Sequence, residues 1–178
     1  DKITYILIDK QPTDIEKIYE NDKNADGKFI LNACKRENFQ RNYIAKGIEE
    51  ASENDWIIVS DLDEIPNLEK NDLTQKNSHL IFFKQKMMYY KFNLLLDDCH
   101  WIGSRACKKK NLITPQWIRN IKSKVYPWWR LDTFFFKNKY NKIEIIKDGG
   151  WHFSYIKNKN DIEKKLKSYL HHREYDVN

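Results

Sequence analysis

The sequence predicts a mixed α/β fold, in which one sheet is flanked by helices. Two short and nearly continuous apolar runs, residues 3–8 (ITYILI) and 56–59 (WIIV), are typical of buried strands. Between them, residues 37–53 carry apolar side chains at helical spacing, with polar residues on the opposite face. Because strand, helix and strand follow one another, we expect a βαβ unit with parallel strands.

The remainder of the chain supplies further strands and a final helix. Residues 79–96 are rich in aromatic side chains and alternate in places, which predicts one or two strands. Residues 143–146 (IEII) predict another short strand, and residues 117–136 before them are dense in aromatic side chains. A helix is expected from about Asp161, which is a suitable N-cap.

The length of 178 residues predicts a single domain over residues 1–178. Because the chain opens directly on the strand-like residues 3–8, we expect that further sequence precedes residue 1. No apolar run approaches the roughly 18 residues of a membrane span. We therefore expect a cytoplasmic protein without a span, and leave a peripheral membrane association open.

The net charge of +6 has two interpretations. Lysine-rich surfaces are often simply solvated, and a basic surface also attracts nucleic acid, anionic membranes or phosphorylated small molecules. The three cysteines, at positions 34, 99 and 107, are widely spaced and form no C-x-x-C pair. This pattern argues against a zinc site and a disulfide framework, and favours a reducing compartment.

An acidic segment directly follows the apolar run 56–59. Asp61, Asp63 and Glu64 crowd into four positions, and their mutual repulsion requires a positive partner. In an open α/β sheet, ligands bind beyond the carboxyl ends of strands, and alternate side chains of an extended segment share one face. The D-x-D pattern of Asp61 and Asp63 therefore suits Mg²⁺ or Mn²⁺ with a phosphorylated ligand. The alternative is that both residues merely cap a turn before Pro66.

Four segments together resemble glycosyltransferase family 17, the β-1,4-mannosyl-glycoprotein β-1,4-N-acetylglucosaminyltransferases and their microbial relatives. The segments are residues 37–67, which include SDLDEIP, then WIGS (101–104), DGGWHFSY (148–155) and KKLKSYLHHRE (164–174). The resemblance implies a GT-A-like (Rossmann-like) fold lacking its N-terminal strand here. It also implies inverting, metal-dependent transfer of N-acetylglucosamine from a UDP-linked nucleotide-sugar donor to a glycan acceptor hydroxyl.

The resemblance also implies roles for the acidic segment and for the segment DGGWHFSY (148–155). Asp63 would bind the metal, and Asp61 would bind the ribose, the metal or both. The metal would neutralise the diphosphate leaving group. Glu64 is a further ligand, an acceptor behind the ligands, or a surface residue. His152 is expected as a third metal ligand, with a core histidine between Trp151 and Phe153 as the alternative. The runs 56–59 and 143–146 each precede one of the two motifs, and parallel strands would bring both loops to one edge of the sheet, where Gly149 and Gly150 would let the backbone turn close to the diphosphate.

Other side chains are candidates for binding or proton transfer. Arg41, Arg130 and Lys165 would face the carboxylates or the diphosphate, and Trp151 would contact the donor. Asp97, Asp98 and Asp132 are candidate bases, of which Asp98 is favoured because it precedes Trp101 in a polar break. Residues proposed to stack on acceptor sugars are Trp101, Trp128 and Trp129, although tryptophan is more often a core residue. His171, His172 and Glu174 match the family's tail without an assigned role.

Two other functions compete with glycosyl transfer. A nucleic-acid-binding protein would use the basic charge and the aromatic residues, but clustered carboxylates repel phosphate, so we expect no nucleic-acid partner. A carbohydrate-binding protein with a degenerate site would bind glycan without transferring a sugar.

Overall fold

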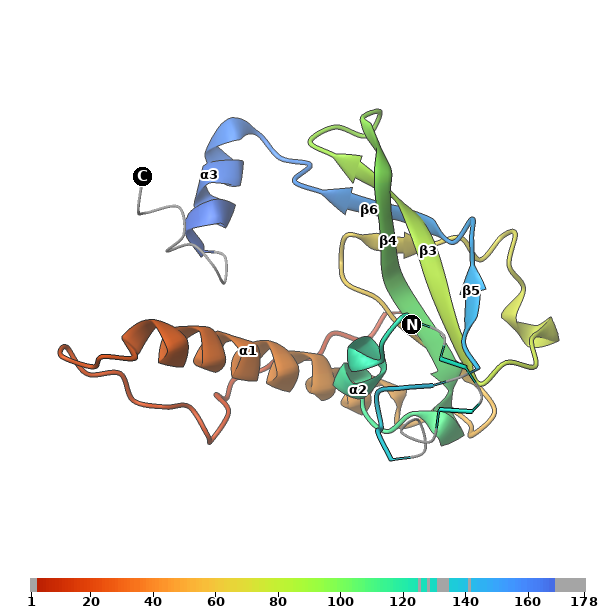
Figure 1. Cartoon of the computed structure of the whole chain (residues 1–178), viewed down its shortest axis with the longest axis horizontal. Coiled ribbons are helices and arrows are strands. Elements are labelled where there is room, and N and C mark those ends of the chain that lie inside the picture. Colours follow the sequence, from red (N-terminus) through yellow and green to blue (C-terminus); the bar gives the residue numbers. More distant parts are fainter. Residues whose placement is uncertain (1–2, 125, 128, 131–134, 141, 169–178) are drawn as a thin grey trace. The chain divides into compact units, whose positions relative to one another are not determined.

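The computed structural model describes residues 3–124, 126–127, 129–130, 135–140 and 142–168 (Figure 1). The chain divides into two compact units. One contains residues 1–49 and 157–178, and the other contains residues 50–156. The expectation of a single domain over the whole chain stays a prediction.

The unit of residues 50–156 is built on a mixed sheet, which confirms the mixed α/β class. Its strand order is β1-β4-β3-β6-β2, and β5 also pairs with β3. The strands are β1 (Trp56–Val59), β2 (Glu64–Pro66), β3 (Leu80–Tyr89), β4 (Leu95–Lys108), β5 (Glu144–Ile146) and β6 (Gly150–Ser154). The strands expected within residues 56–59, 79–96 and 143–146 are therefore present.

Both antiparallel and parallel pairs occur in this sheet. β4 pairs antiparallel with β1 and β3, and β6 pairs antiparallel with β2. β5 and β6 both pair parallel with β3, at successive positions along it. Gly149 joins them, and a Cβ there would lie 2.7 Å from the backbone nitrogen of Lys84. Because Gly149 has no side chain, the backbone can pass from β5 to β6 while it stays beside β3.

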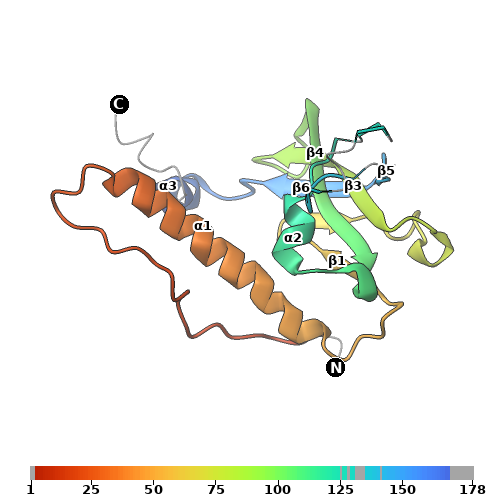
Figure 2. The same ribbon diagram turned by 60° about the horizontal axis from the view of Figure 1, so that its bottom comes forward.

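The core of this unit lies on the central strands. Ile81, Phe82 and Phe83 of β3 are fully buried, as is Ala106 of β4. A short helix, α2 (Pro115–Asn120), contacts β1 and β4 and buries Ile118 (Figure 2). Its start follows from sequence, because the side chain of Thr114 accepts a hydrogen bond from the backbone of Trp117 and Pro115 occupies the first turn.

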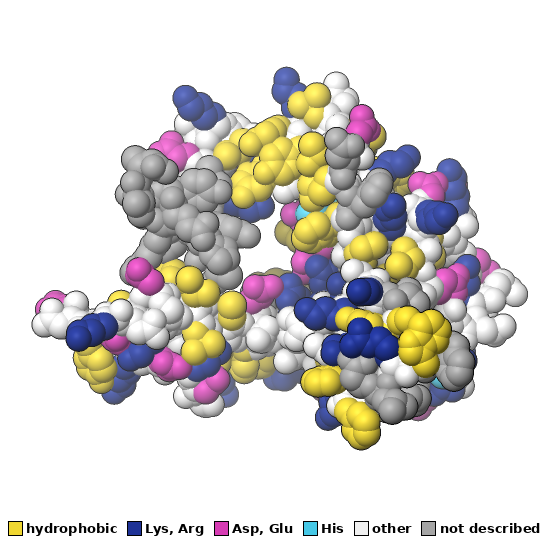
Figure 3. All heavy atoms as spheres, viewed as in Figure 1, with side chains coloured by type: hydrophobic (Ala, Val, Ile, Leu, Met, Phe, Trp, Pro, Cys, Tyr) yellow, Lys and Arg dark blue, Asp and Glu magenta, His cyan; other side chains and the backbone are white. Residues whose placement is uncertain are grey.

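Apolar side chains also gather on the surface over the tip of the β3–β4 hairpin (Figure 3). Tyr90, Phe92 and residues 94–96 are all exposed there. The rings of Tyr89 and Tyr90 meet edge to face, with centroids 4.4 Å apart.

The strand predicted over residues 3–8 is wrong. These residues have irregular backbone structure, and the side chains of Ile3, Tyr5 and Leu7 are exposed. β1 pairs with the antiparallel β4, so the expected βαβ unit does not occur among the described residues. An apolar run indicates that a segment favours burial, but a strand also requires a hydrogen-bonding partner, which the run does not specify.

The helices of the other unit differ in their limits from those expected. α1 (Ala25–Tyr43) begins well before residue 37 and gives way to a 3₁₀ helix, η1 (Ile44–Ile48). A turn precedes α1, in which the carboxylate of Asp22 accepts a hydrogen bond from the backbone nitrogen of Asn24. The last helix, α3 (Lys159–Ser168), begins before Asp161, which is not its N-cap. Instead, the side chain of Asn158 accepts a hydrogen bond from the backbone nitrogen of Asp161.

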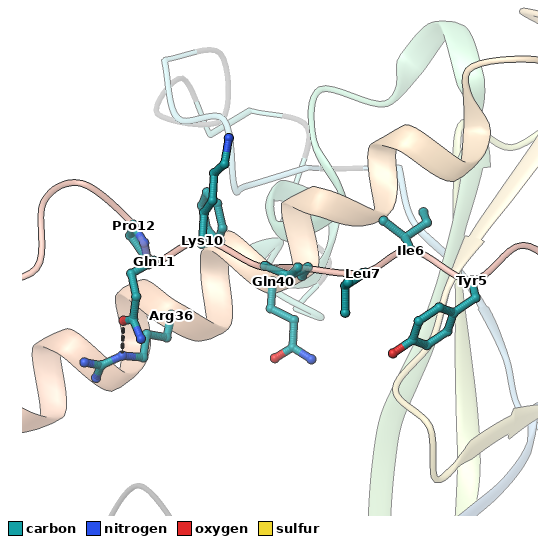
Figure 4. Close-up of a pocket in the computed structure, with 10 residues that line it drawn as sticks. Tyr5, Ile6, Leu7, Lys10, Gln11, Pro12, Arg36 and Gln40 are labelled. Carbon is teal, nitrogen blue, oxygen red and sulfur yellow. Dashed lines mark hydrogen bonds between the residues drawn. The ribbon is translucent and has the colours of Figure 1, made fainter.

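A pocket in this unit lies between the N-terminal segment and α1 (Figure 4). Tyr5, Ile6 and Leu7 line one side, and Gln40 lies on the helix. Farther along, Nε of Arg36 donates a hydrogen bond of 2.8 Å to the side chain of Gln11.

Candidate functional site

The acidic segment forms a tight turn directly after β1. The backbone nitrogen of Glu64 donates to the carbonyl of Asp61 at 3.0 Å, and the hydroxyl of Ser60 donates to the carbonyl of Glu64 at 2.8 Å. The segment thus follows a strand's carboxyl end, as predicted. It is not extended, however, so Asp61 and Asp63 do not share one face as two residues of a strand would.

The positive partner of the acidic segment is Arg119, from the last turn of α2. Its Nη2 lies 2.8 Å from Oδ2 of Asp61, and its Nη1 lies 2.8 Å from Oε2 of Glu64. Nη1 also donates to the backbone carbonyl of Gly103 at 2.6 Å. One guanidinium therefore links the acidic turn to β4, and its side chain is only 11% exposed.

Glu64 is the buried centre of this network, so its interpretation as a surface residue is wrong. Its side chain is 1% exposed. Oε1 accepts from Nη2 of Arg119 at 3.0 Å and from Nε1 of Trp101 at 2.7 Å, and Oε2 accepts from the backbone nitrogen of Asp61 at 3.1 Å. A carboxylate removed from water needs such donors, so Glu64 acts as a hydrogen-bond acceptor behind the turn.

A row of polar side chains, buried at Gln85 and Ser104 and half-buried at Ser60, runs beside this network. The hydroxyls of Ser60 and Ser104 lie 2.5 Å apart, and Nε2 of Gln85 donates to Ser104 at 3.1 Å. A Cβ at Gly103 would lie 1.8 Å from Oε1 of Gln85, so any other residue there would displace that buried side chain. Three residues of the WIGS segment, Trp101, Gly103 and Ser104, thus have contacts in this site.

Strand pairing brings the GGWHFSY motif to the acidic turn. β2 and β6 pair so that Glu64 lies opposite His152, and the backbone nitrogen of Phe153 donates to the carbonyl of Asp63 at 2.8 Å. Nε2 of His152 lies 3.5 Å from Oδ2 of Asp63. The two motifs therefore meet, although by antiparallel pairing within the sheet and not through two loops at the carboxyl ends of parallel strands.

His152 combines features of both interpretations made from the sequence. It is 7% exposed, as a core residue would be, and its ring centroid lies 4.8 Å from that of Trp101. Yet it also lies beside Asp63, whose side chain is 38% exposed. Within the described part of the chain, the buried Nδ1 atom of His152 has no hydrogen-bond partner.

Gly150 makes the pairing of β2 and β6 possible. Its φ angle is 116°, and a Cβ would lie 2.0 Å from the carbonyl oxygen of Ile65. A side chain is thus excluded both by the backbone conformation and by the opposite strand. The glycines expected to allow close approach to a diphosphate are therefore required by the sheet itself.

The predicted metal trio is divided between two contacts in this structure. Asp61 contacts Arg119, whereas Asp63 and His152 contact each other. Among the residues that the structure describes, no three His, Cys, Asp or Glu side chains gather into a group that could hold a metal ion alone. Of the three ligands predicted from the sequence, Asp63 and His152 are the two that lie side by side.

The other predicted residues lie elsewhere or outside the described part of the chain. Arg41 pairs with Glu37 within α1 at 2.9 Å, and Lys165 lies in α3, so both belong to the other unit. Arg130 lies over the ring of Tyr126. Trp151, in β6, and Trp129 are partly or largely exposed, and Asp97 is exposed in β4. Asp98 lies in β4, but its side chain is not described, and Trp128, Asp132, His171, His172 and Glu174 lie outside the described residues.

Sequence reasoning missed Arg119, although it predicted that a cation was needed. The chain has 32 lysine and arginine residues, and nothing local to Arg119 distinguishes it from the others.

Comparison of the chain with protein-family models, with curated proteins and with solved structures finds no match. In the described residues, no helix is both long enough and apolar enough to cross a membrane.

Proposed function

We propose that the chain is an inverting glycosyltransferase with a GT-A-like fold. It transfers a sugar, N-acetylglucosamine, from a UDP-linked donor to a hydroxyl of a glycan, with Mn²⁺ or Mg²⁺ as cofactor. The observation that carries this proposal is the 3.5 Å approach of Asp63 to His152. It joins the two most specific motifs of the family resemblance, SDLDEIP and GGWHFSY, and the WIGS segment contacts both through Trp101.

The donor set of Asp63 and His152 fits a divalent cation that is completed by a substrate. A carboxylate oxygen and an imidazole nitrogen are both metal ligands, and the imidazole nitrogen that faces the Asp63 carboxylate is Nε2. Cations that serve phosphorylated substrates are commonly held by one or two protein groups, with water and phosphate oxygens filling the other positions. When bound, the cation supplies charge neutralisation for the UDP leaving group.

The chain's own residues divide the remaining tasks. Arg119 pairs with both Asp61 and Glu64, and Asp63 is the acidic residue of the turn that lies next to His152. Trp101 is 36% exposed and offers an aromatic face beside His152 on which a pyranose ring can stack. Asp98 is proposed as the base that accepts the proton of the acceptor hydroxyl.

One observation favours a second candidate, a carbohydrate-binding protein without transferase activity. The charges of Asp61 and Glu64 are satisfied by Arg119, an internal partner, which is also what a purely structural role requires. Such a protein would keep its exposed aromatic residues for glycan binding and would not need a nucleotide.

Thermal unfolding with a panel of nucleotide sugars, with and without Mn²⁺, tests the two candidates. The transferase should be stabilised by UDP-N-acetylglucosamine only when Mn²⁺ is present, and should release UDP when a glycan acceptor is added. Asp63→Asn should lose the metal-dependent stabilisation. Asp148→Asn is the matched control, because this half-exposed carboxylate pairs with Lys70 away from the turn.

Two results would contradict the proposal. One is the absence of any metal-dependent nucleotide-sugar effect on the wild-type protein. The other is an Asp63→Asn variant that responds to UDP and Mn²⁺ as the wild type does. Stabilisation by glycans alone, without nucleotide or metal, would instead support the carbohydrate-binding candidate.

A further inference from the structure

We propose that Arg119 is a positioning residue for the site, acting through Glu64 on the ring of Trp101 and on the turn that carries Asp63. The role in transfer rests on the proposed function. The positioning itself does not, because it is defined by contacts within the chain.

The guanidinium of Arg119 joins three parts of the unit that are separate in sequence. It comes from α2 and contacts Asp61 and Glu64 in the acidic turn and the carbonyl of Gly103 in β4. Both oxygens of Glu64 receive a hydrogen bond from it. A planar group with several fixed donors can hold these acceptors together, whereas the single ammonium of lysine cannot reproduce that geometry.

Glu64 transmits this constraint to the rest of the site. The oxygen that accepts from Nη2 of Arg119 also accepts from the indole of Trp101. Its other oxygen accepts from the backbone of Asp61 and so fixes the start of the turn. The position of the glutamate carboxylate therefore determines both where the indole lies and how the turn is held.

The position of Trp101 in turn affects Asp63 and His152, the two donors proposed for the cation. The Trp101 ring packs against the ring of His152, with 4.8 Å between centroids, and His152 lies beside Asp63. Arg119 contacts neither His152 nor Asp63 in any hydrogen bond or ion pair that the described structure contains. Its effect on these two residues is thus indirect, through Glu64, Trp101 and the turn.

The test must separate positioning from simple loss of stability. Replacing Arg119 with alanine would leave the buried carboxylate of Glu64 without its counter-ion, which strongly destabilises the fold. Arg119→Lys keeps the positive charge but removes the planar guanidinium with its several donors. The double variant Arg119→Gln with Glu64→Gln removes both charges and leaves polar, uncharged side chains at both positions, so it provides a second folded protein for measurement.

The direct readout is the indole N–H of Trp101 in ¹H–¹⁵N spectra, assigned with a Trp101→Phe variant. In the wild type this proton is hydrogen-bonded to Glu64, and we expect it to exchange slowly with water. In Arg119→Lys and in the double variant we expect a shifted resonance and exchange at least about tenfold faster, in an otherwise folded spectrum. Glu144→Gln, which removes an ion pair with Lys76 elsewhere in the unit, should leave the indole unchanged.

The kinetic readout connects positioning to the proposed transfer. Well below the unfolding temperature of each variant, Arg119→Lys should raise KM for the UDP-linked donor about tenfold or more, with a smaller change in kcat, because residues that orient ligands act on affinity. Glu144→Gln should leave both constants unchanged.

The outcomes distinguish this inference from the proposed function. A wild-type indole signal and exchange rate in a folded Arg119 variant would overturn the positioning role, whatever the activity of the protein. A released indole with unaltered donor KM would overturn its role in transfer. If the wild type binds neither Mn²⁺ nor UDP but the indole is released in the variants, the proposed function fails and the positioning role stands.

Discussion

His152 and Asp63 lie 3.5 Å apart, measured from Nε2 to Oδ2, because β6 pairs with β2 directly beside the acidic turn. The first residue is buried and the second is partly exposed. A carboxylate beside an imidazole at the boundary between core and surface is a place where a solvent-borne cation can reach both donors. Because the two residues contact each other, substitution of either one tests the role of the pair.

The first prediction concerns His152. His152→Asn should abolish the Mn²⁺-dependent stabilisation by UDP, because the imidazole donor is lost, while the protein remains folded. His79→Asn is the matched control, since His79 contacts Asn111 away from the acidic turn. Melting curves with and without Mn²⁺ and UDP measure both effects. A large loss of stability combined with retained activity per folded molecule would instead identify His152 as a core residue only.

The second prediction concerns Gly150. Gly150→Ala should destabilise the protein by at least about 1–3 kcal/mol, because the φ of 116° is strained for alanine and the Cβ would overlap the carbonyl of Ile65. Gly27→Ala in α1 is the contrasting case. There the added Cβ meets only the movable side chain of Asn24, and alanine favours the helix by up to about 1 kcal/mol.

Urea unfolding of both glycine variants provides the comparison. Equal stability changes at Gly150 and Gly27 would show that the tight pairing of β2 and β6 does not form in solution.

The third prediction concerns the buried pair of Glu64 and Arg119. Removing one charge, as in Glu64→Gln, should cost up to about 3–5 kcal/mol of unfolding free energy, because the buried Arg119 loses its buried partner and keeps only the partly exposed Asp61. The double variant Glu64→Gln with Arg119→Gln should recover part of this loss. A double-mutant cycle by chemical denaturation measures the coupling. Strictly additive losses would mean that the two side chains do not interact as described.

The fourth prediction concerns pH. Hydrogen bonds from Lys76 and Ser78 lower the pKa of Glu144 from its ordinary value of 4.5. Since the folded pKa lies below the unfolded one, the glutamate contributes stability above about pH 4.5, and this contribution disappears as the pH falls toward the folded pKa. The difference in stability between wild type and Glu144→Gln should therefore be constant near neutral pH and shrink under acid conditions.

The control for this titration is Glu69→Gln, at an exposed carboxylate, which should change the pH profile of stability very little. A wild-type advantage over Glu144→Gln that grows as the pH falls would contradict the assigned direction of the pKa shift.

The fifth prediction concerns the cysteines. All three are free thiols, and burial raises the pKa of Cys107 to about 12. Because the thiolate is the reactive form, Cys107 should resist alkylation at pH 8 in the native protein, whereas the half-buried Cys34 and Cys99 should react sooner. Peptide mass spectrometry after brief alkylation measures this order. Rapid native labelling of Cys107 would contradict the buried position of β4 at that residue.

Some features of this protein follow from local sequence. Residues 56–59 form a strand, because a run of large apolar residues favours a buried extended chain. The short strand at 144–146 follows for the same reason. The chemical character of the acidic segment was also evident, since three carboxylates within four positions require a positive charge nearby. These properties depend on residues close together in the chain, and local propensity suffices to predict them.

Tertiary structure alone decided which groups meet. The cation that pairs with Asp61 and Glu64 is Arg119, which the packing of α2 against β1 and β4 selects from 32 basic residues. The approach of Asp63 to His152 arises from antiparallel pairing of β2 with β6, whereas the sequence order had indicated parallel strands. Residues 3–8 are apolar enough for a strand but have no strand partner in the described sheet. Hydrogen-bond partners and counter-ions lie far away along the chain, so their identity depends on how the strands pair, which apolar patterns do not specify.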